Sequence, residues 1–357
     1  MAIFRFVNNP QRIKAYLNDP EKKNILQVIK ELITLAFYKK EIPYYYFTHL
    51  YKKEVDNIRD YLSTNQRAQI HADVEMNRVE YVSILENKLN FAFYFEKFNL
   101  RTPRAIAHNF SNHFFHKGNV QILHTNDDLK NYFRHILRSQ EANELFARPL
   151  SLLGGKGCFK LTLDNLEEKL NEHKNSLIAQ SYLFTEVIKQ HPKINEIHRN
   201  AVNTIRFLTY ITDEGKIEIL SAAMRFGIGE SVVDNNSSGG FFIKVDKREG
   251  TLAKAGWTKP HFGGIKITHH PDTNFKLEGF KIPFYQEACK MVVEYAQYIP
   301  HKLIGWDVAV GIDGPTVIEA NHNPFLTLSD IGAEGLLRNP SFRSFMEEVT
   351  MRRKRRK

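Results

Sequence analysis

The sequence predicts an α+β protein in which two lobes enclose a cleft and a helical extension precedes them. Residues 20–90 are mostly helical in pattern, with apolar side chains at helical spacing. Between residues 87 and 188, strand-like runs alternate with amphipathic stretches. From residue 204 onwards, strand-like runs follow one another across short turns, which favours antiparallel pairing.

The extension begins with a helix, because apolar residues between Ile25 and Ala36 fall on one helical stripe. Pro43 ends this helix, and residues 51–84 resume a helical pattern with interleaved charges. In the remaining chain we expect helices at residues 87–98, 127–139, 165–174 and 284–299. We expect strands at residues 105–107, 145–149, 158–163, 183–188, 204–212, 216–225 and 240–245.

A chain of 357 residues exceeds the size of about 250 to 300 residues at which single cores stop growing, so we expect several domains. The expected division is a helical extension over residues 1–86, a main body over residues 87–348 and a basic tail over residues 349–357. Within the body we expect a small lobe at about residues 117–185 and a large lobe at about residues 186–348.

The composition indicates a folded protein that is not secreted. Apolar residues make up 42% and aromatic residues 12%, far from the composition of disordered chains. Cys158 and Cys289 are too few for a disulfide framework and lack metal-ligand spacing. Residues 1–10 show no signal pattern, and Lys30 and Glu31 interrupt the apolar window at residues 25–37. We therefore expect a cytoplasmic location.

The net charge of +10 makes nucleic-acid binding one alternative. However, six Lys and Arg residues lie together at residues 352–357, and the rest of the chain has no basic stripe interleaved with aromatics. We therefore expect no nucleic-acid partner. The basic tail is expected to be a solvated end or to contact anionic lipids at the inner face of the membrane.

Residues 304–324 predict a β-hairpin that holds a metal ion. Side chains alternate along a strand, so Glu319 and Asn321 share one face. A three-residue loop at residues 313–315 pairs Asp307 with Asn321, whereas a two-residue loop at residues 313–314 puts Asp307 out of step, so we expect the former. Two carboxylates and an amide are hard oxygen ligands that suit Mg²⁺. The alternative is an edge hairpin whose polar face meets water.

Residues 151–157 join two predicted strands and contain three glycines. Glycine lets a backbone approach phosphate oxygens closely, and Lys156 adds a positive charge. Arg148 places a permanent cation just before this loop. The segment is not a Walker A loop, because the G-x-x-x-x-G-K-[ST] pattern is missing. We expect either a phosphate-binding loop or a structural hairpin.

Arg206 and Arg225 lie on successive predicted strands, where planar guanidinium groups suit phosphate or carboxylate oxygens. The alternative for each is a surface ion pair. Residues 235–240, Asn-Asn-Ser-Ser-Gly-Gly, predict a small polar loop between strands. Such a loop suits backbone contact with a ligand, although an ordinary turn has the same composition.

Taken in order, these motifs resemble the ATP-grasp superfamily, whose fold has two α+β lobes that clasp ATP. The segments Glu186-Val-Ile-x-Gln-His-Pro192 and Val202-Asn-Thr-Ile-Arg206 are similar to the branch associated with sugar transfer and cell-surface polysaccharide synthesis. The chain is also similar to ligases that add glutamate to a ribosomal protein. The resemblance covers roughly residues 87–330.

The resemblance implies a role for each matching position. Arg206 and Arg225 are expected to stabilise the transferred phosphoryl group and the intermediate. Other positions are expected to bind ATP phosphates (Lys88, Arg148, Gly154, Gly155, Lys156, Gly157), adenine at a hinge (Glu186, Val187, Ile188), the acceptor substrate (Asn203, Asn235, Asn236, Gly239, Gly240) and Mg²⁺ (Asp307, Glu319, Asn321).

The implied reaction is an ATP-dependent ligation that forms an amide through an acyl phosphate. The expected substrates are a carboxylate and an amine, for example an amino acid and a nucleotide- or lipid-linked sugar. The alternative is a kinase that uses the same cleft to phosphorylate a sugar hydroxyl. A ligase releases inorganic phosphate at each turnover, whereas a kinase does not.

Overall fold

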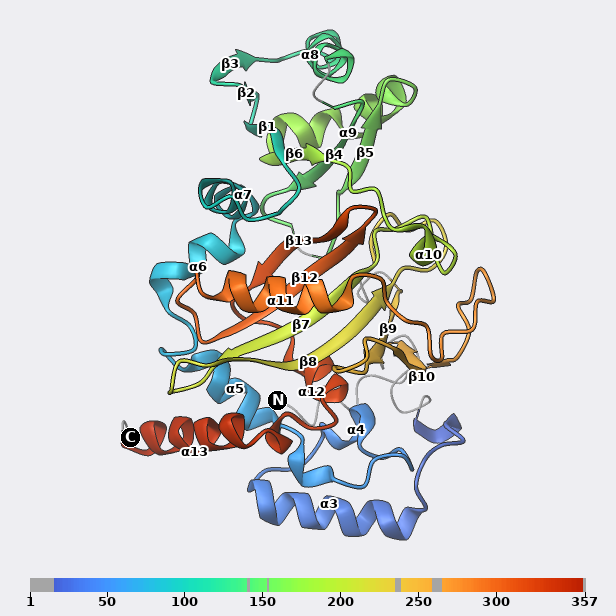
Figure 1. Cartoon of the computed structure of the whole chain (residues 1–357), viewed down its shortest axis with the longest axis vertical. Coiled ribbons are helices and arrows are strands. Elements are labelled where there is room, and N and C mark those ends of the chain that lie inside the picture. Colours follow the sequence, from blue (N-terminus) through green and yellow to red (C-terminus); the bar gives the residue numbers. More distant parts are fainter. Residues whose placement is uncertain (1–15, 140–141, 153, 235–238, 259–264, 356–357) are drawn as a thin grey trace.

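The computed structural model describes residues 16–139, 142–152, 154–234, 239–258 and 265–355 (Figure 1). Two antiparallel sheets form its frame, one of six strands and one of seven. This arrangement confirms the predicted α+β class. None of the helices in these described ranges has the length and apolarity needed to cross a bilayer.

The six-stranded sheet has the strand order β3-β2-β1-β6-β4-β5. Helices α8 and α9 pack together and bury their apolar faces in one cluster with the sheet. A capping box begins α8, because the hydroxyl of Thr125 accepts the N–H of Asp128 and the Asp128 carboxylate accepts the N–H of Thr125. The elements are β1 (Ala105–Phe110), β2 (His113–His116), β3 (Asn119–Ile122), α8 (Asn126–Arg138), β4 (Glu144–Pro149), β5 (Phe159–Thr162), α9 (Leu166–Ala179) and β6 (Tyr182–Glu186).

The seven-stranded sheet has the strand order β11-β10-β9-β8-β7-β12-β13. Helix α11 contacts β7, β8, β12 and β13, and α12 contacts β7, β8 and β9. The elements are α10 (Pro192–Asn195), β7 (Thr204–Ile211), β8 (Ile217–Phe226), β9 (Phe241–Val245), β10 (Leu252–Thr258), β11 (Lys266–Ile267), α11 (Tyr285–Ala296), β12 (Leu303–Gly311), β13 (Gly314–Asn321), α12 (Leu326–Gly332), η4 (Leu336–Arg338) and α13 (Pro340–Arg355).

The helical extension packs against the seven-stranded sheet. Leu62, Ile70 and Met76 share a buried cluster with strand residues and with α13. Asp330 joins the two ends of the chain, because its carboxylate accepts the backbone N–H of Leu62 and that of Leu336, each at 2.8 Å. The elements are α3 (Ile25–Lys39), α4 (Tyr46–His49), η1 (Ile58–Asp60), α5 (Thr64–Ala72), α6 (Val79–Glu86) and α7 (Lys88–Lys97).

The structure differs from the sequence prediction in several segments. Residues 51–84 form short helices, because Ser63 caps α5 and Asp73 ends it. The hairpin β2–β3 and the strands β10 and β11 were not predicted; β3 is exposed along its whole length and therefore shows no alternation. Instead of a separate tail, α13 continues to Arg355, and the guanidinium of Arg352 lies 3.3 Å from the Asp73 carboxylate.

Candidate functional site

The β12–β13 hairpin places Asp307 directly opposite Glu319, so the register predicted from the sequence was wrong. Gly311 pairs with Gly314, which leaves a two-residue loop, and Pro315 lies within β13 opposite Val310. An irregularity between Asp307 and Val308 then leaves one residue of β13, Ile318, without a partner in the ladder. This bulge changes the phase of the strand and aligns the two carboxylates.

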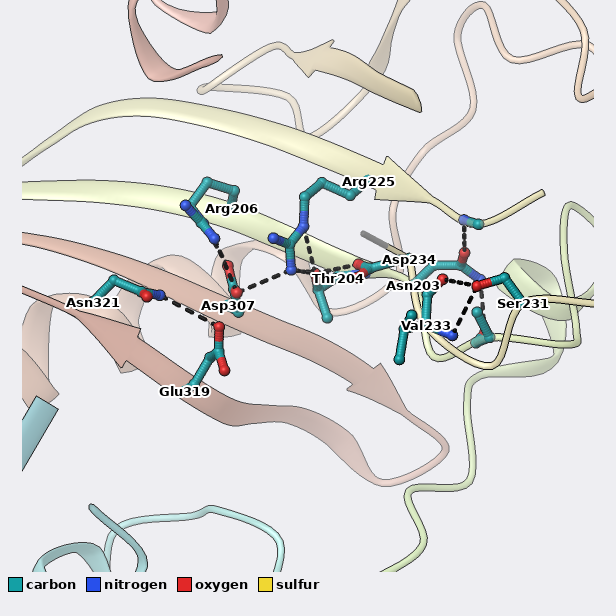
Figure 2. Close-up of polar contacts among 12 residues, drawn as sticks. Asn203, Thr204, Arg206, Arg225, Ser231, Val233, Asp234, Asp307, Glu319 and Asn321 are labelled. Carbon is teal, nitrogen blue, oxygen red and sulfur yellow. Dashed lines mark hydrogen bonds and ion pairs between the residues drawn. The ribbon is translucent and has the colours of Figure 1, made fainter. Parts of the chain in front are cut away.

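The same row of the sheet continues into β7, where Arg206 lies opposite Asp307 (Figure 2). Its guanidinium donates to both oxygens of Asp307, and the Nη2 bond measures 3.0 Å. Arg225 on β8 adds a second cation, with its Nη2 2.9 Å from Asp307 Oδ2. Burial alone would raise the pKa of Asp307, but these two arginines lower it well below its usual range.

Glu319 has weaker compensation. The amide of Asn321 lies 3.5 Å from Glu319 Oε1, the distance at which a hydrogen bond is weak. Burial raises the pKa of Glu319, and the neighbouring Asp307 carboxylate raises it further. A divalent cation would relieve this repulsion, and two carboxylates with an amide are ligands that Mg²⁺ accepts. The donor set therefore fits the predicted metal.

Two residues that sequence reasoning missed complete the environment of Arg225. The Thr204 hydroxyl accepts hydrogen bonds from Arg225 Nε at 3.1 Å and from Nη2 at 2.6 Å. The Asp234 carboxylate lies 3.4 Å from Arg225 and also accepts the N–H of Thr204 at 2.8 Å. Although burial alone would lower the pKa of Arg225, Asp234 and Asp307 raise it above its usual value. Arg225 is therefore a fixed cation.

Lys88 and Arg148 form a second group of cations. The ammonium of Lys88 donates to the carbonyl of Leu152 at 3.0 Å, and Arg148 Nη1 donates to the carbonyl of Ile318 at 3.3 Å. Within the described part of the chain, the buried Nε of Arg148 has no hydrogen-bond partner. Burial lowers the pKa of both groups. These cations therefore retain hydrogen-bonding capacity for an anion.

Both groups line one cavity of about 720 Å³ between the two sheets. Its remaining wall is partly apolar, with Phe146, Val202 and Ile318 among the lining residues. The predicted site residues that line it are Lys88, Arg148, Gly154, Gly155, Glu186, Val187, Ile188, Arg225, Asp307, Glu319 and Asn321.

Other predicted residues lie elsewhere. Arg206 reaches the cavity only through Asp307, and Lys156 is exposed. The side-chain amide of Asn203 is fully buried, where it donates to the carbonyls of His198 and Ala201 and accepts the N–H of Gly227. Gly157, Gly239 and Gly240 are not among the cavity-lining residues, and Asn235 and Asn236 lie outside the described residues.

The helical extension contributes to the cavity wall, which sequence reasoning did not predict. Glu86 and His322 both line the cavity, and Glu86 Oε1 lies 2.6 Å from His322 Nε2. The other ring nitrogen of His322 lies 3.0 Å from Asn77 Oδ1. These contacts fasten the segment that follows Asn321 to α6. The order of the motifs gives no signal for them.

His198, His270 and Asp272 bring three possible metal-ligand atoms within 4.8 Å of one another. However, His270 Nδ1 accepts the backbone N–H of Asp272 at 3.2 Å, and its Nε2 lies 3.0 Å from the carbonyl of Gly227. Both nitrogens of this ring are therefore engaged within the protein. The cluster is better explained as a hydrogen-bonded support for the segment around Gly227.

A family model described as sugar-transfer associated ATP-grasp matches residues 69–342. Among solved structures, the ATP-grasp ligase PsnB with minimal precursor, Mg and ADP is 14% identical, with a TM-score of 0.40 over 77% of this chain and 61% of that one. D-alanyl-alanine synthetase A from Vibrio cholerae is 11% identical, with a TM-score of 0.42 over 76% and 65%. N5-carboxyaminoimidazole synthase from Aspergillus clavatus is 9% identical, with a TM-score of 0.38 over 68% and 46%. The chain thus spans less than two thirds of each of these proteins. No curated protein gave a significant match.

Proposed function

Because the chain belongs to the family of sugar-transfer-associated ATP-grasp proteins, we propose that it ligates a carboxylate to an amine at the expense of ATP. The reaction proceeds through an acyl phosphate. ATP transfers its γ-phosphoryl group to the carboxylate, which releases ADP, and the amine then displaces inorganic phosphate to form an amide. The amine loses its proton in this last step.

One observation supports this proposal above the others: a single cavity is lined both by cations with hydrogen-bonding capacity and by a pair of carboxylates. Lys88 and Arg148 are the cations, and Asp307 and Glu319 are the carboxylates. A nucleoside triphosphate requires both cations and carboxylates, because its phosphates need positive charge and its metal ion needs oxygen ligands. Arg148 contacts the backbone carbonyl of Ile318, the residue before Glu319, so the cations and the carboxylates are neighbours in this cavity.

We place the phosphates of ATP beside Lys88 and Arg148, under the backbone of Gly154 and Gly155. The adenine ring would lie against the hinge formed by residues 186–188, which line the cavity. Glu186 is half exposed, and its carboxylate accepts the backbone N–H of Arg104 at 3.1 Å, which holds the first hinge residue in place. Apolar residues such as Phe146 and Ile318 exclude water around the base.

Asp307, Glu319 and Asn321 would hold Mg²⁺, which when bound neutralises the charge on the phosphate oxygens. Arg225 keeps its full charge at the border of the cavity, so it stabilises negative charge as it develops on the transferred group. Arg206 acts through Asp307, which it holds by two hydrogen bonds. The reaction requires no covalent intermediate on the protein.

We propose an amino acid or a sugar acid as the carboxylate, and an amino sugar on a nucleotide or lipid carrier as the amine; the family's association with sugar transfer supports a sugar among the substrates. These substrates imply a role in cell-surface polysaccharide synthesis. The test is release of ADP and phosphate from a matrix of such pairs, with mass spectrometry of the product.

Hydroxylamine identifies the intermediate, because it traps an acyl phosphate as a hydroxamate. We expect a hydroxamate from the wild type and none from Glu319→Gln. Omission of the amine with hydroxylamine present should leave ADP release intact. A stable phosphorylated sugar, with neither free phosphate nor hydroxamate, would replace the ligase with a kinase.

A further inference from the structure

Helix α3 carries an apolar stripe on its outer surface. Ile25, Leu26, Ile29, Ile33 and Phe37 have exposed fractions of 62%, 77%, 48%, 53% and 81%. Their spacing of one, three or four residues places them on one face of the helix. We call these five residues the α3 stripe. Contiguous exposed apolar surface of this kind marks an interaction site.

The opposite face of α3 anchors the helix to the protein. Val28 and Leu35 are buried in a cluster with tyrosines of the extension. The carboxylate of Glu31 accepts hydrogen bonds from Lys23 Nζ and from the hydroxyl of Tyr46, both at 2.8 Å. The helix therefore cannot turn to bury the stripe without breaking these contacts.

A hollow of about 350 Å³ adjoins the stripe and enlarges the apolar surface. Ile42, which is 60% exposed, lies at its rim. Leu32, Ile33, Ala36, Ile42, Pro43, Tyr44 and Phe47 line the hollow.

Lysines border the stripe, whereas the adjoining acidic residues have other partners: Glu21 lies 3.6 Å from Lys266 Nζ, and Glu41 accepts the backbone N–H groups of residues 64 and 65. Lys22 precedes the first turn of α3, Lys30 lies at the edge of the stripe, and Lys40 follows the last turn. Glu31 is the single acidic residue in α3, and it belongs to the opposite face. An apolar stripe bordered by lysines is the pattern of a helix that lies in the interface of an anionic membrane.

We infer that the α3 stripe docks on a bilayer that contains anionic lipids. A second copy of the chain fits less well, because symmetric pairing of two stripes would bring their bordering lysines together. The same charges attract phosphate groups of lipids, and the apolar side chains enter the acyl region. This inference does not depend on the proposed ligase reaction.

Figure 1 supports the geometry, since α3 lies at the end of the molecule opposite the six-stranded sheet. The basic C-terminal helix α13 lies toward the same end, and Arg353 on it is exposed. The cavity lies between the sheets, away from α3. Docking through the stripe therefore leaves the cavity open.

The test is co-sedimentation of the full chain with vesicles of phosphatidylcholine alone or mixed equally with phosphatidylglycerol. We expect binding to the mixed vesicles that weakens at high salt, and at least about 10-fold weaker binding to the neutral ones. The double variant Leu26→Asp, Phe37→Asp should reduce partitioning at least about 10-fold. Its melting temperature and ATP turnover should remain those of the wild type, because both side chains are exposed.

The matched control is Val79→Asp, Phe110→Asp, which replaces two apolar residues that are 81% and 69% exposed outside the stripe. This control should bind vesicles like the wild type. Equal binding by the stripe variant, or no binding by the wild type, would overturn the inference. A dimeric wild type and a monomeric stripe variant in light scattering would instead assign the stripe to a second copy.

Discussion

Two groups of charged residues in the cavity differ in how their charges are compensated. Lys88 on α7 and Arg148 on β4 contact backbone carbonyls, and a buried nitrogen of Arg148 has no hydrogen-bond partner among the described residues. On the side of the seven-stranded sheet, arginines and carboxylates pair with one another: Arg206 and Arg225 meet Asp307, Asp234 and the nearby Glu319. We call these the cationic wall and the paired wall.

This difference shows which ligand each wall can accept. The cationic wall has unused positive charge and therefore favours an anion. The paired wall holds three carboxylates and two arginines, so one negative charge remains when all are ionised. A cation beside Glu319 balances that charge. The cationic wall should thus govern affinity for the nucleotide, and the paired wall should govern both stability and turnover.

The largest expected effect lies in the paired wall. Glu319→Gln should lower kcat/KM for ATP by about 10³-fold, because it removes the carboxylate that balances the metal. The melting temperature should not fall, since the change also removes repulsion with Asp307. Glu278→Gln, at a half-exposed surface position, is the matched control. Normal turnover in folded Glu319→Gln protein would exclude the proposed metal site.

Arg206→Ala should destabilise the protein by about 3 kcal/mol, because it leaves the buried Asp307 with one arginine in place of two. Urea unfolding measures this effect. The same truncation in the cationic wall, Arg148→Ala, should change the free energy of unfolding by less than about 1 kcal/mol, since no carboxylate of the described residues forms an ion pair with Arg148. Equal losses of unfolding free energy in the two variants would contradict the proposed difference between the walls.

Asp330 is a buried carboxylate outside the paired wall, and it lies 3.9 Å from the guanidinium of Arg67. Burial raises its pKa to about 6. Because the folded state then binds this proton more tightly than the unfolded state, the free energy of unfolding should fall as pH rises from 4 to 6 and stay low above it. Relative to Asp330→Asn, the wild type should lose about 3 kcal/mol over this window in urea titrations. An identical pH dependence of stability in both proteins would contradict the contribution of Asp330.

Arg148→Ala tests the cationic wall through binding. The KM for ATP should rise by about 10²-fold, because the variant loses the buried cation that we propose to bind the phosphates. Isothermal titration with ADP should show the same direction. Arg248, whose side chain is 93% exposed, offers the control Arg248→Ala. A selective loss of kcat with unchanged nucleotide affinity would move Arg148 from binding to catalysis.

The smallest expected effect concerns the contact of Gly155 with Val233. A Cβ atom at Gly155 would lie 2.7 Å from a methyl carbon of Val233, and the φ of Gly155 is +73°. Gly155→Ala should therefore lower kcat/KM by about 10-fold through displacement of the loop. Gly118→Ala has a similar φ of +75° but meets nothing within 4 Å, so it isolates backbone strain. Equal behaviour of the two variants would show that steric contact with Val233 is unimportant.

The sequence predicted the ligand types in the hairpin but not their register. Alternation along β13 placed Glu319 and Asn321 on one face, as any strand would. The bulge at Ile318 has no glycine or proline to mark it, so the pairing of Asp307 with Glu319 depends on the folded sheet. The family resemblance inferred from the order of motifs is confirmed by the family match.

The network around Arg225 could not be predicted from the sequence for a different reason. Asp234 and Thr204 are 30 residues apart, and Arg206 and Asp307 are 101 apart. Arg206 contacts Asp307 because β12 lies beside β7, although the chain forms several other elements between them. Asp234 reaches Thr204 because Val233 forms a bridge with Val202. No local pattern encodes such a strand order. The contact of Glu86 with His322 has the same origin, since it joins the extension to the end of β13.

The bond between Leu62 and Asp330 has a consequence for biosynthesis, because these residues are separated by 268 positions. At a translation rate of about 5 to 20 residues per second, Leu62 leaves the ribosome roughly 13 to 54 s before its partner. During that interval Leu62, Ile70 and Met76 lack the strands and the C-terminal helix that later cover them. The nascent chain therefore exposes this apolar surface until the strands and α13 have been synthesised, and chaperones that bind unfolded chains have that time in which to act.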